Sequence, residues 1–412
     1  RNVRARSQKQ RKKYQCLISL VGFSPAPVIL TIKTLEPEFV LFLHTKDTQN
    51  QLDVIVEKSG LKPSAYRPQP VSDSKTEDVY LAIKKLISEF PDQSIAVDIT
   101  GGKKSMVGGA AIAGALTGCD IFYIDFSEYD KQGRQPVPGS EYLNFLSNPF
   151  VIFGDLEFEE GKQLFNKGNY YAAAHIFGEL AEKIPQNEQA VFLQFLSQMF
   201  KEWDEYNFPA AQDACDNALK QAKRCHIYSE LWEALAEKSQ LLERLKSGDA
   251  ASLVLNHYFT SRRMAERGRY DFAALLLYRT LEMAFATHLK SAFHFDVDNA
   301  DYTSLQDDVE QKYFNAGKSI YGKKYENEPL PRILGLMNAY QLLLGLDDPI
   351  IREENPKRIL GIAQLRNRSI LAHGTSSVSA SVYQKILDCF LPYLQRFAEI
   401  YFGNGTMGSF EE

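Results

Sequence analysis

Short apolar runs alternate with helix-like segments through the first third of the chain, and this alternation limits the folds available to it. The apolar runs have strand length, are bounded by turn residues, and occupy residues 17–22, 39–44, 95–100 and 121–125. Segments with helical spacing lie between them, at residues 28–35, 77–89 and 105–116. A chain that alternates in this way forms a mostly parallel sheet with helices on both faces. We therefore expect a Rossmann-like α/β domain, in which ligands bind beyond the carboxyl ends of the strands.

The pattern changes after residue 155, where the remaining segments have helical spacing. Turn residues at 133–149 punctuate the end of the α/β domain, and small and large residues from Gly161 to Phe177 follow the rhythm of one helical hairpin. Later helices are expected at residues 270–289, 333–346, 359–372 and 382–401, the last around Pro392. At 412 residues the chain is too long for one ordinary core. We expect four parts: a basic tail (1–13), the α/β domain (14–150), a helical connector (151–249) and an all-helical domain (250–412).

The composition narrows the classes of site and setting. Hydrophobic residues make up 44% and charged residues 24%, as in a soluble globular protein, and no apolar run reaches the ~20 residues of a membrane span. Five scattered cysteines without a Cys-x-x-Cys pair indicate a reducing, cytoplasmic setting and neither a disulfide framework nor a zinc site. The net charge of −5 means that a polyanion would have to bind at local clusters. Seven Lys or Arg residues among the first thirteen predict a disordered basic tail, with transient RNA contact as the alternative.

The sharpest motif of the first half is a Gly-Gly turn between a predicted strand and a predicted helix. It reads Asp98-Ile-Thr100-Gly101-Gly102-Lys103-Lys104-Ser105-Met106. The glycines let a ligand approach the backbone, the helix start offers free N–H groups and a positive dipole end, and the lysines add charge. These features suit phosphate groups, and a tight turn without a ligand is the alternative. The motif is neither a Walker A loop nor a Gly-x-Gly-x-x-Gly fingerprint, so nucleoside triphosphate hydrolysis and NAD binding lack their usual signature.

Two other predicted strands end in polar turn residues. Gly22-Phe-Ser24-Pro follows the first strand, and Thr45 follows the second. If these strands are neighbours in the sheet, the ends of all three line one rim, because the carboxyl ends of parallel strands meet at the same edge.

A second motif lies near the end of the chain, on the predicted helix 359–372. It reads Arg366-Asn367-Arg368-Ser-Ile-Leu-Ala-His373-Gly374. Arg366 and His373 are two helical turns apart and project from one face, whereas Arg368 lies about 140° around the helix from His373. Histidine can move protons and arginine can stabilise a phosphorane, which is enough to make RNA cleave itself through its 2′-OH without a metal. No Asp, Glu and His cluster has metal-ligand spacing, and the alternative is a capping histidine beside surface arginines.

The Gly-Gly turn at 98–106 and the turn at 22–25 resemble those of the CARF domain, the cyclic-oligoadenylate sensor of type III CRISPR systems. Residues 129–141, 148–150 and 154–156 resemble its continuation in one branch of those proteins. The resemblance implies that residues 14–150 dimerise, so that two copies of the turn hold a ring of adenylates. It carries over these residues as ligand-facing: Gly22, Ser24, Thr45, Thr100, Gly101, Gly102, Lys103, Lys104 and Met106.

The motif at 366–373 resembles the Arg-x4–6-His motif of HEPN ribonucleases, and residues 271–282 resemble the first long helix of that fold. The family spacing allows either Arg366 or Arg368 as the motif arginine. Helical phase and the adjoining Asn367 favour Arg366, which leaves Arg368 to contact the substrate phosphate, with His373 completing the catalytic set. HEPN domains pair, so one copy per chain implies a homodimer. On the earlier helix, Arg279 and Glu282 are one turn apart, and we expect a structural ion pair there.

A CARF-like domain joined to a HEPN-like domain matches the CRISPR-associated accessory ribonucleases of type III systems, of the Csm/Csx type. The resemblance implies a metal-independent endoribonuclease that cuts single-stranded RNA when a cyclic tetra- or hexa-adenylate activates it. It also implies a cytoplasmic homodimer that uses neither DNA nor a membrane. Two alternatives stay open: a non-catalytic regulator that responds to a cyclic nucleotide, and a sensor that also degrades its activator.

Overall fold

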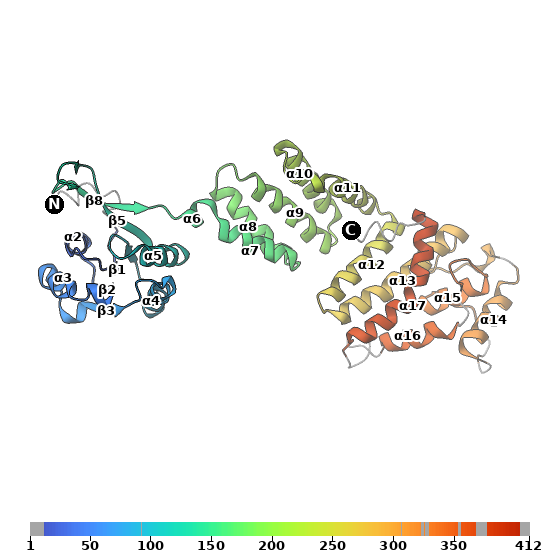
Figure 1. The fold of residues 1–412 in the computed structure, drawn as a ribbon. Coiled ribbons are helices and arrows are strands. Elements are labelled where there is room, and N and C mark those ends of the chain that lie inside the picture. Colours follow the sequence, from blue (N-terminus) through green and yellow to red (C-terminus); the bar gives the residue numbers. More distant parts are fainter. Residues whose placement is uncertain are drawn as a thin grey trace. The chain divides into compact units, whose positions relative to one another are not determined.

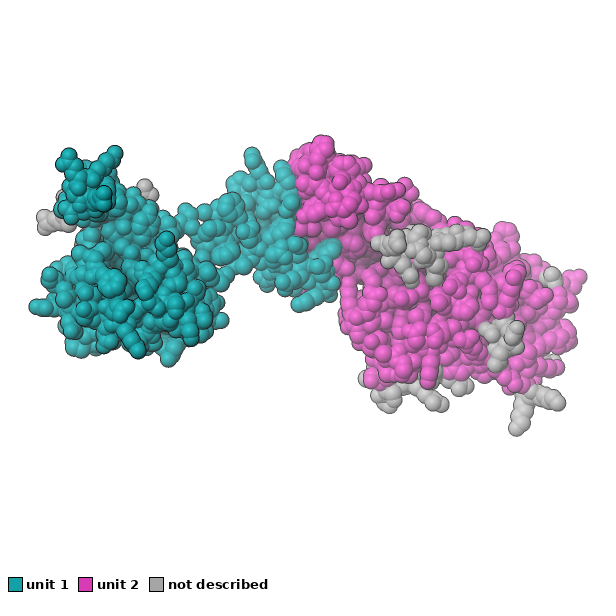
Figure 2. Space-filling view, viewed as in Figure 1, with its two compact units in different colours: residues 1–167, 176–190 teal, residues 168–175, 191–412 magenta. Residues whose placement is uncertain are grey.

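A computed structural model describes residues 12–91, 93–305, 307–322, 325, 329–352, 356–367 and 377–403, with side chains omitted for 363–367. The chain divides into two compact units, residues 1–167 with 176–190 and residues 168–175 with 191–412 (Figure 2). No helix in the described part of the chain is long and apolar enough to cross a membrane.

A six-stranded sheet forms the core of the N-terminal domain (Figure 1). Its spatial order is β3-β2-β1-β4-β5-β8. The first five strands in that order run parallel, and β8 pairs antiparallel with β5. The strands are β1 (Cys16–Leu20), β2 (Phe39–His44), β3 (Tyr66–Pro70), β4 (Ile95–Asp98), β5 (Asp120–Phe126) and β8 (Glu141–Leu146). The predicted Rossmann-like α/β domain is confirmed.

Helices cover both faces of this sheet because successive strand residues point to opposite sides. They are α2 (Ala26–Leu35), α3 (Gln51–Ser59), α4 (Thr76–Glu89) and α5 (Lys104–Leu116). On one face Ile18 and Val97 pack with Ile83 of α4 and Met106 of α5. On the other face Leu17, Phe42 and Phe122 pack with Val28 of α2 and Ile55 of α3. The sheet is therefore buried on both sides, as its near-continuous apolar strands require.

The stretch 133–149, expected to close the α/β domain, carries two strands that were not predicted from the sequence. A short hairpin of β6 (Tyr129–Asp130) and β7 (Gln135–Pro136) leads into β8, whose Leu143 is buried against the sheet core. Gly133 lies in the turn of this hairpin, Pro138 and Gly139 lie between β7 and β8, and Pro149 begins α6. Strand β3 and helix α3 were also not predicted. The sequence of β3 lacks a strand pattern because it carries two prolines and little apolar character.

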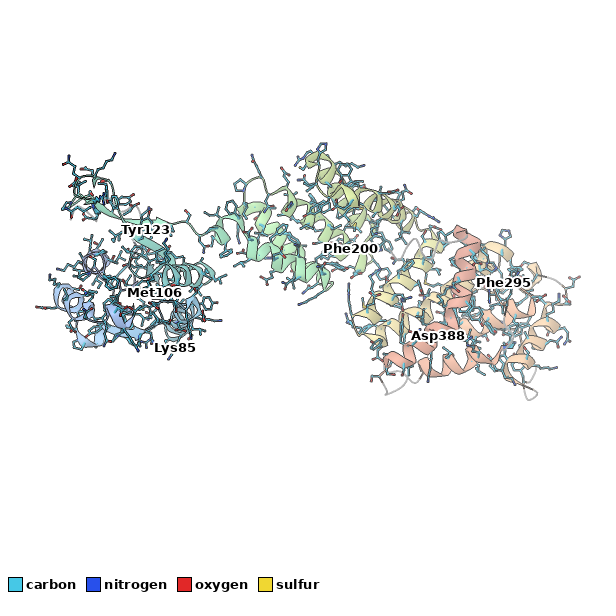
Figure 3. All side chains as sticks on the ribbon, viewed as in Figure 1. Lys85, Met106, Tyr123, Phe200, Phe295 and Asp388 are labelled. Atoms are coloured by element: carbon cyan, nitrogen blue, oxygen red, sulfur yellow. The ribbon has the colours of Figure 1, made fainter. Side chains whose placement is uncertain are left out.

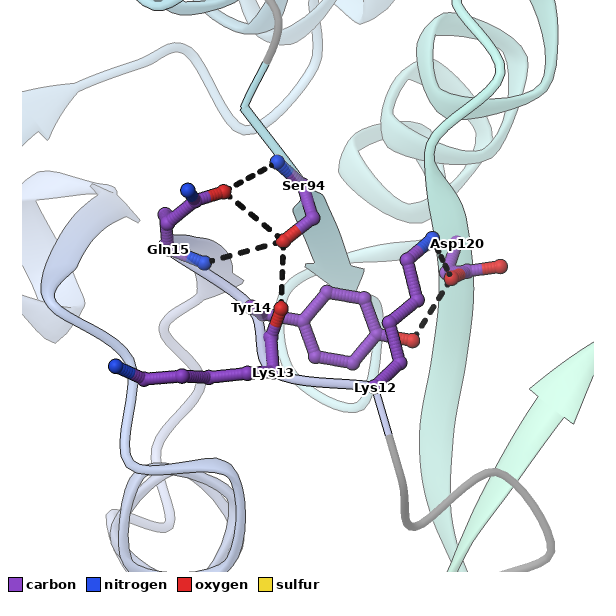
Figure 4. Close-up of polar contacts among 6 residues, drawn as sticks. All are labelled: Lys12, Lys13, Tyr14, Gln15, Ser94 and Asp120. Carbon is purple, nitrogen blue, oxygen red and sulfur yellow. Dashed lines mark hydrogen bonds and ion pairs between the residues drawn. The ribbon is translucent and has the colours of Figure 1, made fainter.

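The first residues of the described chain are tied to the sheet (Figure 4). The Lys12 ammonium and the Tyr14 hydroxyl each donate to Asp120 Oδ2 over 2.8 Å, and Lys13 pairs with Glu38 at 3.0 Å. Ser94, just before the central strand β4, holds the same segment, since its hydroxyl donates to the Lys13 carbonyl over 2.6 Å. Lys12 and Lys13 therefore belong to the fold and not to a disordered tail, and residues 1–11 lie outside the described residues.

The middle of the chain is helical. Its helices are α6 (Pro149–Phe153), α7 (Asp155–Asn166), α8 (Tyr170–Lys183), α9 (Glu188–Asp204), α10 (Phe208–Cys225) and α11 (Trp232–Lys246). The predicted helical hairpin is confirmed in α7 and α8: a Cβ on Gly161 would stand 2.8 Å from the Phe177 ring, so only glycine lets the helices approach this closely.

Short 3-10 helices occur in all three parts of the chain. They are η1 (Lys46–Thr48), η2 (Pro63–Ala65), η3 (Ser229–Leu231) and η4 (Tyr302–Ser304).

The last part of the chain is an all-helical domain around an aromatic core. Its helices are α12 (Ala250–Glu266), α13 (Tyr270–Phe293), α14 (Val309–Tyr321), α15 (Leu336–Gly345), α16 (Lys357–Asn367) and α17 (Ala380–Phe402). Phe285 of α13 lies at its centre, with its ring 6.2 Å from that of Tyr340 and 5.9 Å from that of Tyr393. Helix α15 begins three residues later than the predicted 333–346, and α17 continues through Pro392.

Candidate functional site

A cavity of about 250 Å³ opens at the carboxyl ends of β1, β2 and β4. These strands are neighbours in the sheet, so the rim expected from the sequence exists. Eight of the nine residues predicted to face a ligand line the cavity, and Lys104 is the exception. The lining comprises Val21, Gly22, Phe23, Ser24, Pro27, Val28, Thr45, Asp47, Thr48, Thr100, Gly101, Gly102, Lys103 and Met106.

The two glycines of the turn serve different purposes. Gly101 passes directly over the end of β1, where an added Cβ would overlap the Leu20 carbonyl oxygen and stand 2.8 Å from the Gly22 nitrogen. Gly102 has a φ of +84°, in the left-handed region that side chains disfavour. The first glycine thus permits a close approach of backbone to backbone, and the second permits the bend that starts α5.

A buried carboxylate holds the turn in place. Asp98 ends β4 with no exposed surface and accepts from the Thr100 amide over 2.9 Å, the Thr100 hydroxyl over 2.5 Å and the Ser19 hydroxyl over 3.1 Å. Burial raises the pKa of Asp98, and these hydrogen bonds oppose the rise. The Thr100 hydroxyl also accepts from the Ile124 amide over 2.8 Å. Thr100 lines the cavity, but its hydroxyl proton is donated to Asp98. Only the second lone pair of the hydroxyl oxygen is therefore open to a ligand.

The charge at the helix start is balanced by an acid that the sequence reasoning missed. Lys103 forms an ion pair with Asp73, and the Ser105 hydroxyl donates to the Asp73 backbone carbonyl. Through this contact the pKa of Asp73 is lowered and that of Lys103 is raised. Asp73 lies thirty residues before Lys103, in the loop between β3 and α4, and no motif marks it. An anion at this site has to compete with the Asp73 carboxylate for Lys103.

The end of β2 supplies a second polar wall. Thr45 caps the 3-10 helix η1, and its amide donates to the Thr48 hydroxyl over 3.1 Å. Asp47 lines the cavity beside them and adds a carboxylate. Helix α5 begins without a side-chain cap, because its N-cap Lys103 carries no acceptor. The first N–H groups of α5 are therefore left for a ligand or water.

The second motif lies largely outside the described residues. Arg366 and Asn367 are the last two residues of α16, with backbone alone described, and Arg368 and His373 fall outside the description. Both flanks of the motif are anchored. Ile359 of α16 is fully buried, and after the motif the Val378 amide donates to Asp271 at the start of α13 over 2.9 Å.

The predicted ion pair on α13 is confirmed, since Arg279 Nη1 lies 2.6 Å from Glu282 Oε2. In the described residues no group of three or more His, Cys, Asp or Glu side chains could hold a metal ion.

Models of known protein families match this chain from residue 153 to residue 397. The family model described as "Csm6 6H domain" matches residues 153–245, and the one described as "Csm6 HEPN domain" matches residues 244–397. The CRISPR system endoribonuclease Csm6 of Thermus thermophilus is 26% identical over 379 residues, covering 87% of this chain and 80% of that protein.

A solved structure shares the fold along almost the full length. It is Enterococcus italicus Csm6 bound to cyclic hexa-2′-fluoro-hexa-dAMP, with a TM-score of 0.58, 11% identity and 97% of each chain covered. The two family models together span more than half of the residues, and the Thermus thermophilus relative carries the same name. The chain therefore belongs to the Csm6 family of CRISPR-associated endoribonucleases, with a C-terminal HEPN domain.

Proposed function

We propose that the chain is a metal-independent endoribonuclease of type III CRISPR defence that cuts single-stranded RNA when a cyclic oligoadenylate binds at the strand-end cavity. The observation that carries this proposal is the cavity itself, joined in one chain to a HEPN ribonuclease domain. The domain roles follow the four-part division: residues 14–150 sense the ligand, 151–249 connect, and 250–412 cut RNA.

The cavity suits part of a cyclic oligoadenylate rather than the whole ring. It offers glycine backbone, an uncapped helix start and Lys103, which together bind phosphate oxygens. At about 250 Å³ it falls below the usual range for drug-sized ligands, so it holds one portion of a larger molecule. Two copies of the chain, each supplying one cavity, would hold a cyclic oligoadenylate.

Exposed apolar side chains on α5 and on α6, where the N-terminal domain joins the connector, support such a homodimer. The exposed fractions are 50% for Ile112 of α5, 67% for Val151 and 63% for Phe153 of α6. The two helices are neighbours, since the Asn148 amide donates to the Ala115 carbonyl over 2.7 Å. Large exposed apolar side chains on neighbouring helices are typical of a site of protein association.

At the second motif we assign His373 to proton transfer and Arg366 to the charge on phosphorus. The 2′-OH loses its proton as O2′ attacks phosphorus, and the bond to O5′ breaks as O5′ gains a proton. The products are a 2′,3′-cyclic phosphate and a 5′-hydroxyl, so no water or metal enters the step. Asn367 and Arg368 contact the substrate beside them. In this proposal the protein acts in the cytoplasm and does not use DNA as a substrate.

The test measures cleavage of a labelled single-stranded RNA in EDTA, with no activator, cyclic tetra-adenylate or cyclic hexa-adenylate. We expect one ring size to raise the rate, and His373→Ala to lower the activated rate at least about 100-fold. His294→Asn is the matched control, because His294 is an exposed histidine whose left-handed φ of +52° asparagine also adopts.

Cleavage that EDTA abolishes would overturn the metal-independent mechanism, and full activity of His373→Ala would overturn the HEPN assignment. If no RNA is cut under any condition, the non-catalytic regulator replaces the ribonuclease. Loss of the activator from the mixture over time would show that the sensor also degrades its ligand.

A further inference from the structure

A second cavity of about 340 Å³ lies among three helices within the second compact unit. Each helix contributes residues from one face, as spacings of three, four and seven require. The lining residues are Phe200 and Trp203 of α9, Glu237, Lys238, Gln240, Leu241 and Arg244 of α11, and Asn256, Phe259 and Arg263 of α12. None of them belongs to the strand-end cavity or to the motif at 366–373.

Aromatic rings form one wall of this inter-helix cavity. The rings of Phe200 and Trp203 are nearly parallel, at 11° with centroids 6.3 Å apart, and Phe200 is labelled on α9 in Figure 3. Phe259 of α12 adds a third ring to the lining. Flat aromatic surfaces of this kind bind planar rings by stacking.

A buried amide without a partner points to a ligand with a hydrogen-bond acceptor. Asn256 is only 3% exposed, and its Oδ1 accepts from the Trp203 indole over 2.7 Å. An indole N–H can only donate, so this contact fixes which end of the amide faces Trp203. The other end, Nδ2, is buried with no hydrogen-bond partner among the described residues. Such a donor destabilises the fold unless something in the cavity accepts from it.

The cavity lining carries more cations than carboxylates, and its two arginines are also paired with carboxylates outside the lining. Lys238, Arg244 and Arg263 line it against one carboxylate, Glu237. Arg244 uses Nε and Nη2 on Asp249, and Arg263 lies 3.4 Å from Asp204. Neither contact engages every donor of the guanidinium group, which carries five N–H bonds.

We propose that the inter-helix cavity binds a nucleotide. The base stacks against the wall of Phe200 and Trp203, a ring acceptor takes the free Asn256 N–H, and the phosphate lies at the cationic side. The volume is in the range of small-molecule sites. The nucleotide is either free in solution or one unit of an RNA strand, and both present the same chemistry. This site does not depend on the proposed function of the strand-end cavity.

The chain offers a direct optical test, because it contains only two tryptophans. Trp232 lies outside the cavity lining and donates to the Ile227 carbonyl, so Trp232→Phe leaves Trp203 as the sole reporter. In that background, Trp203 fluorescence is titrated with AMP, adenosine, inorganic phosphate and a 2′-O-methyl trinucleotide, which cannot be cleaved. We expect saturable quenching by AMP or by the trinucleotide, and at least tenfold weaker binding of adenosine and phosphate. AMP binding assigns the free nucleotide, and trinucleotide binding alone assigns RNA.

Three variants of the lining and one control variant separate ligand binding from general loss of structure. Asn256→Asp keeps an acceptor for Trp203 and removes the free donor, and Leu241→Phe fills the cavity. Both should weaken binding at least tenfold. Arg244→Gln should weaken binding severalfold, whereas Lys246→Gln, on the same helix and outside the lining, should change nothing.

Melting temperature gives a second readout, because a ligand that binds the native state stabilises it. Wild type should melt higher with AMP or the trinucleotide present, and Asn256→Asp should lose that rise. Absence of saturable quenching by either nucleotide would show that water alone fills the cavity, and would overturn the proposal. Unchanged affinity in both Asn256→Asp and Leu241→Phe would do the same.

Discussion

The strand-end cavity and the motif at 366–373 differ in what supplies their chemistry. At the cavity, most of the shape comes from backbone: Gly101 passes over the Leu20 carbonyl, Gly102 takes a left-handed φ, and buried Asp98 holds the turn. At the motif, the proposed reacting groups are ionisable side chains, and of these Arg366 lies in the last turn of α16. Substitutions should therefore act through geometry at the cavity and through the rate of cleavage at the motif.

The largest expected effect tests which arginine of the motif stabilises the transition state. Arg366→Ala should lower activated RNA cleavage about 100- to 1,000-fold, as the loss of a preorganised charge does elsewhere. Arg368→Ala should lower it about tenfold, mainly through KM, because a phosphate contact is lost from substrate and transition state alike. The measurement is initial rate against RNA concentration at saturating activator.

Lys357→Ala is the control for this pair, since Lys357 is an exposed cation at the start of the same helix, and its rate should stay within twofold. If the effects of Arg366→Ala and Arg368→Ala are reversed, Arg368 is the motif arginine and helical phase has misled the assignment.

The next effect contrasts two glycines of the N-terminal domain. Gly101→Ala should destabilise this domain by about 2–3 kcal/mol and remove activation, because the new Cβ overlaps the Leu20 carbonyl. Gly108→Ala should be neutral or stabilising, since Gly108 lies within α5 with open space beside it and alanine favours the helix. Thermal unfolding and activator titration measure both. A normal response in Gly101→Ala would show that the turn is not shaped by this contact.

The difference between local sequence patterns and long-range contacts explains how much of the molecule could be predicted from the sequence. Parallel strands buried on both faces produce continuous apolar runs, so β1, β2, β4 and β5 were found, and the Gly-Gly turn after β4 located the cavity. Its lining could be assembled because neighbouring strands end at one edge. Strand β8 was missed because its pairing with β5 is a long-range choice that no local pattern reveals.

Charge balance at the cavity was also beyond the sequence. Asp73 lies in a loop and Asp47 in the short 3-10 helix η1; their positions depend on the whole sheet, and neither belongs to a recognisable motif. The same holds for the inter-helix cavity. The contact between Trp203 and Asn256 joins residues 53 apart in the chain, and helical spacing alone shows only that each faces inward.

The ion pair between Asp73 and Lys103 predicts that substitutions can either raise or lower the activator concentration needed for cleavage. Lys103→Ala should raise the activator concentration for half-maximal cleavage about tenfold, and less at high salt, because an exposed charge is screened. Asp73→Asn should lower that concentration, since Lys103 is released from its acidic partner. Dose–response curves at two salt concentrations measure both, and Lys85→Ala on α4 is the control, because Lys85 is exposed and lies outside the lining (Figure 3). A weaker response in Asp73→Asn would mean that the ion pair positions Lys103 rather than competing for it.

The smallest effect is a pH dependence centred on Asp98. Burial raises the pKa of Asp98 above its unfolded value of about 3.9, so the folded state binds the proton more tightly than the unfolded state. The contribution of Asp98 to the free energy of unfolding should then fall as pH rises from about 4 to the raised pKa, and stay level above it. Asp98→Asn lacks this titration, so the stability of wild type relative to the variant should decline across that window.

Hydrogen exchange of the β4 amides, corrected for intrinsic rates, isolates this domain from the rest of the chain. Asp53→Asn, an exposed carboxylate on α3, should leave the pH profile of wild type unchanged. A relative stability that rises with pH instead would show that the donors from Thr100 and Ser19 outweigh burial. The turn would then be held by an ionised carboxylate, and the cavity beside it would carry one more negative charge for an anionic ligand to overcome.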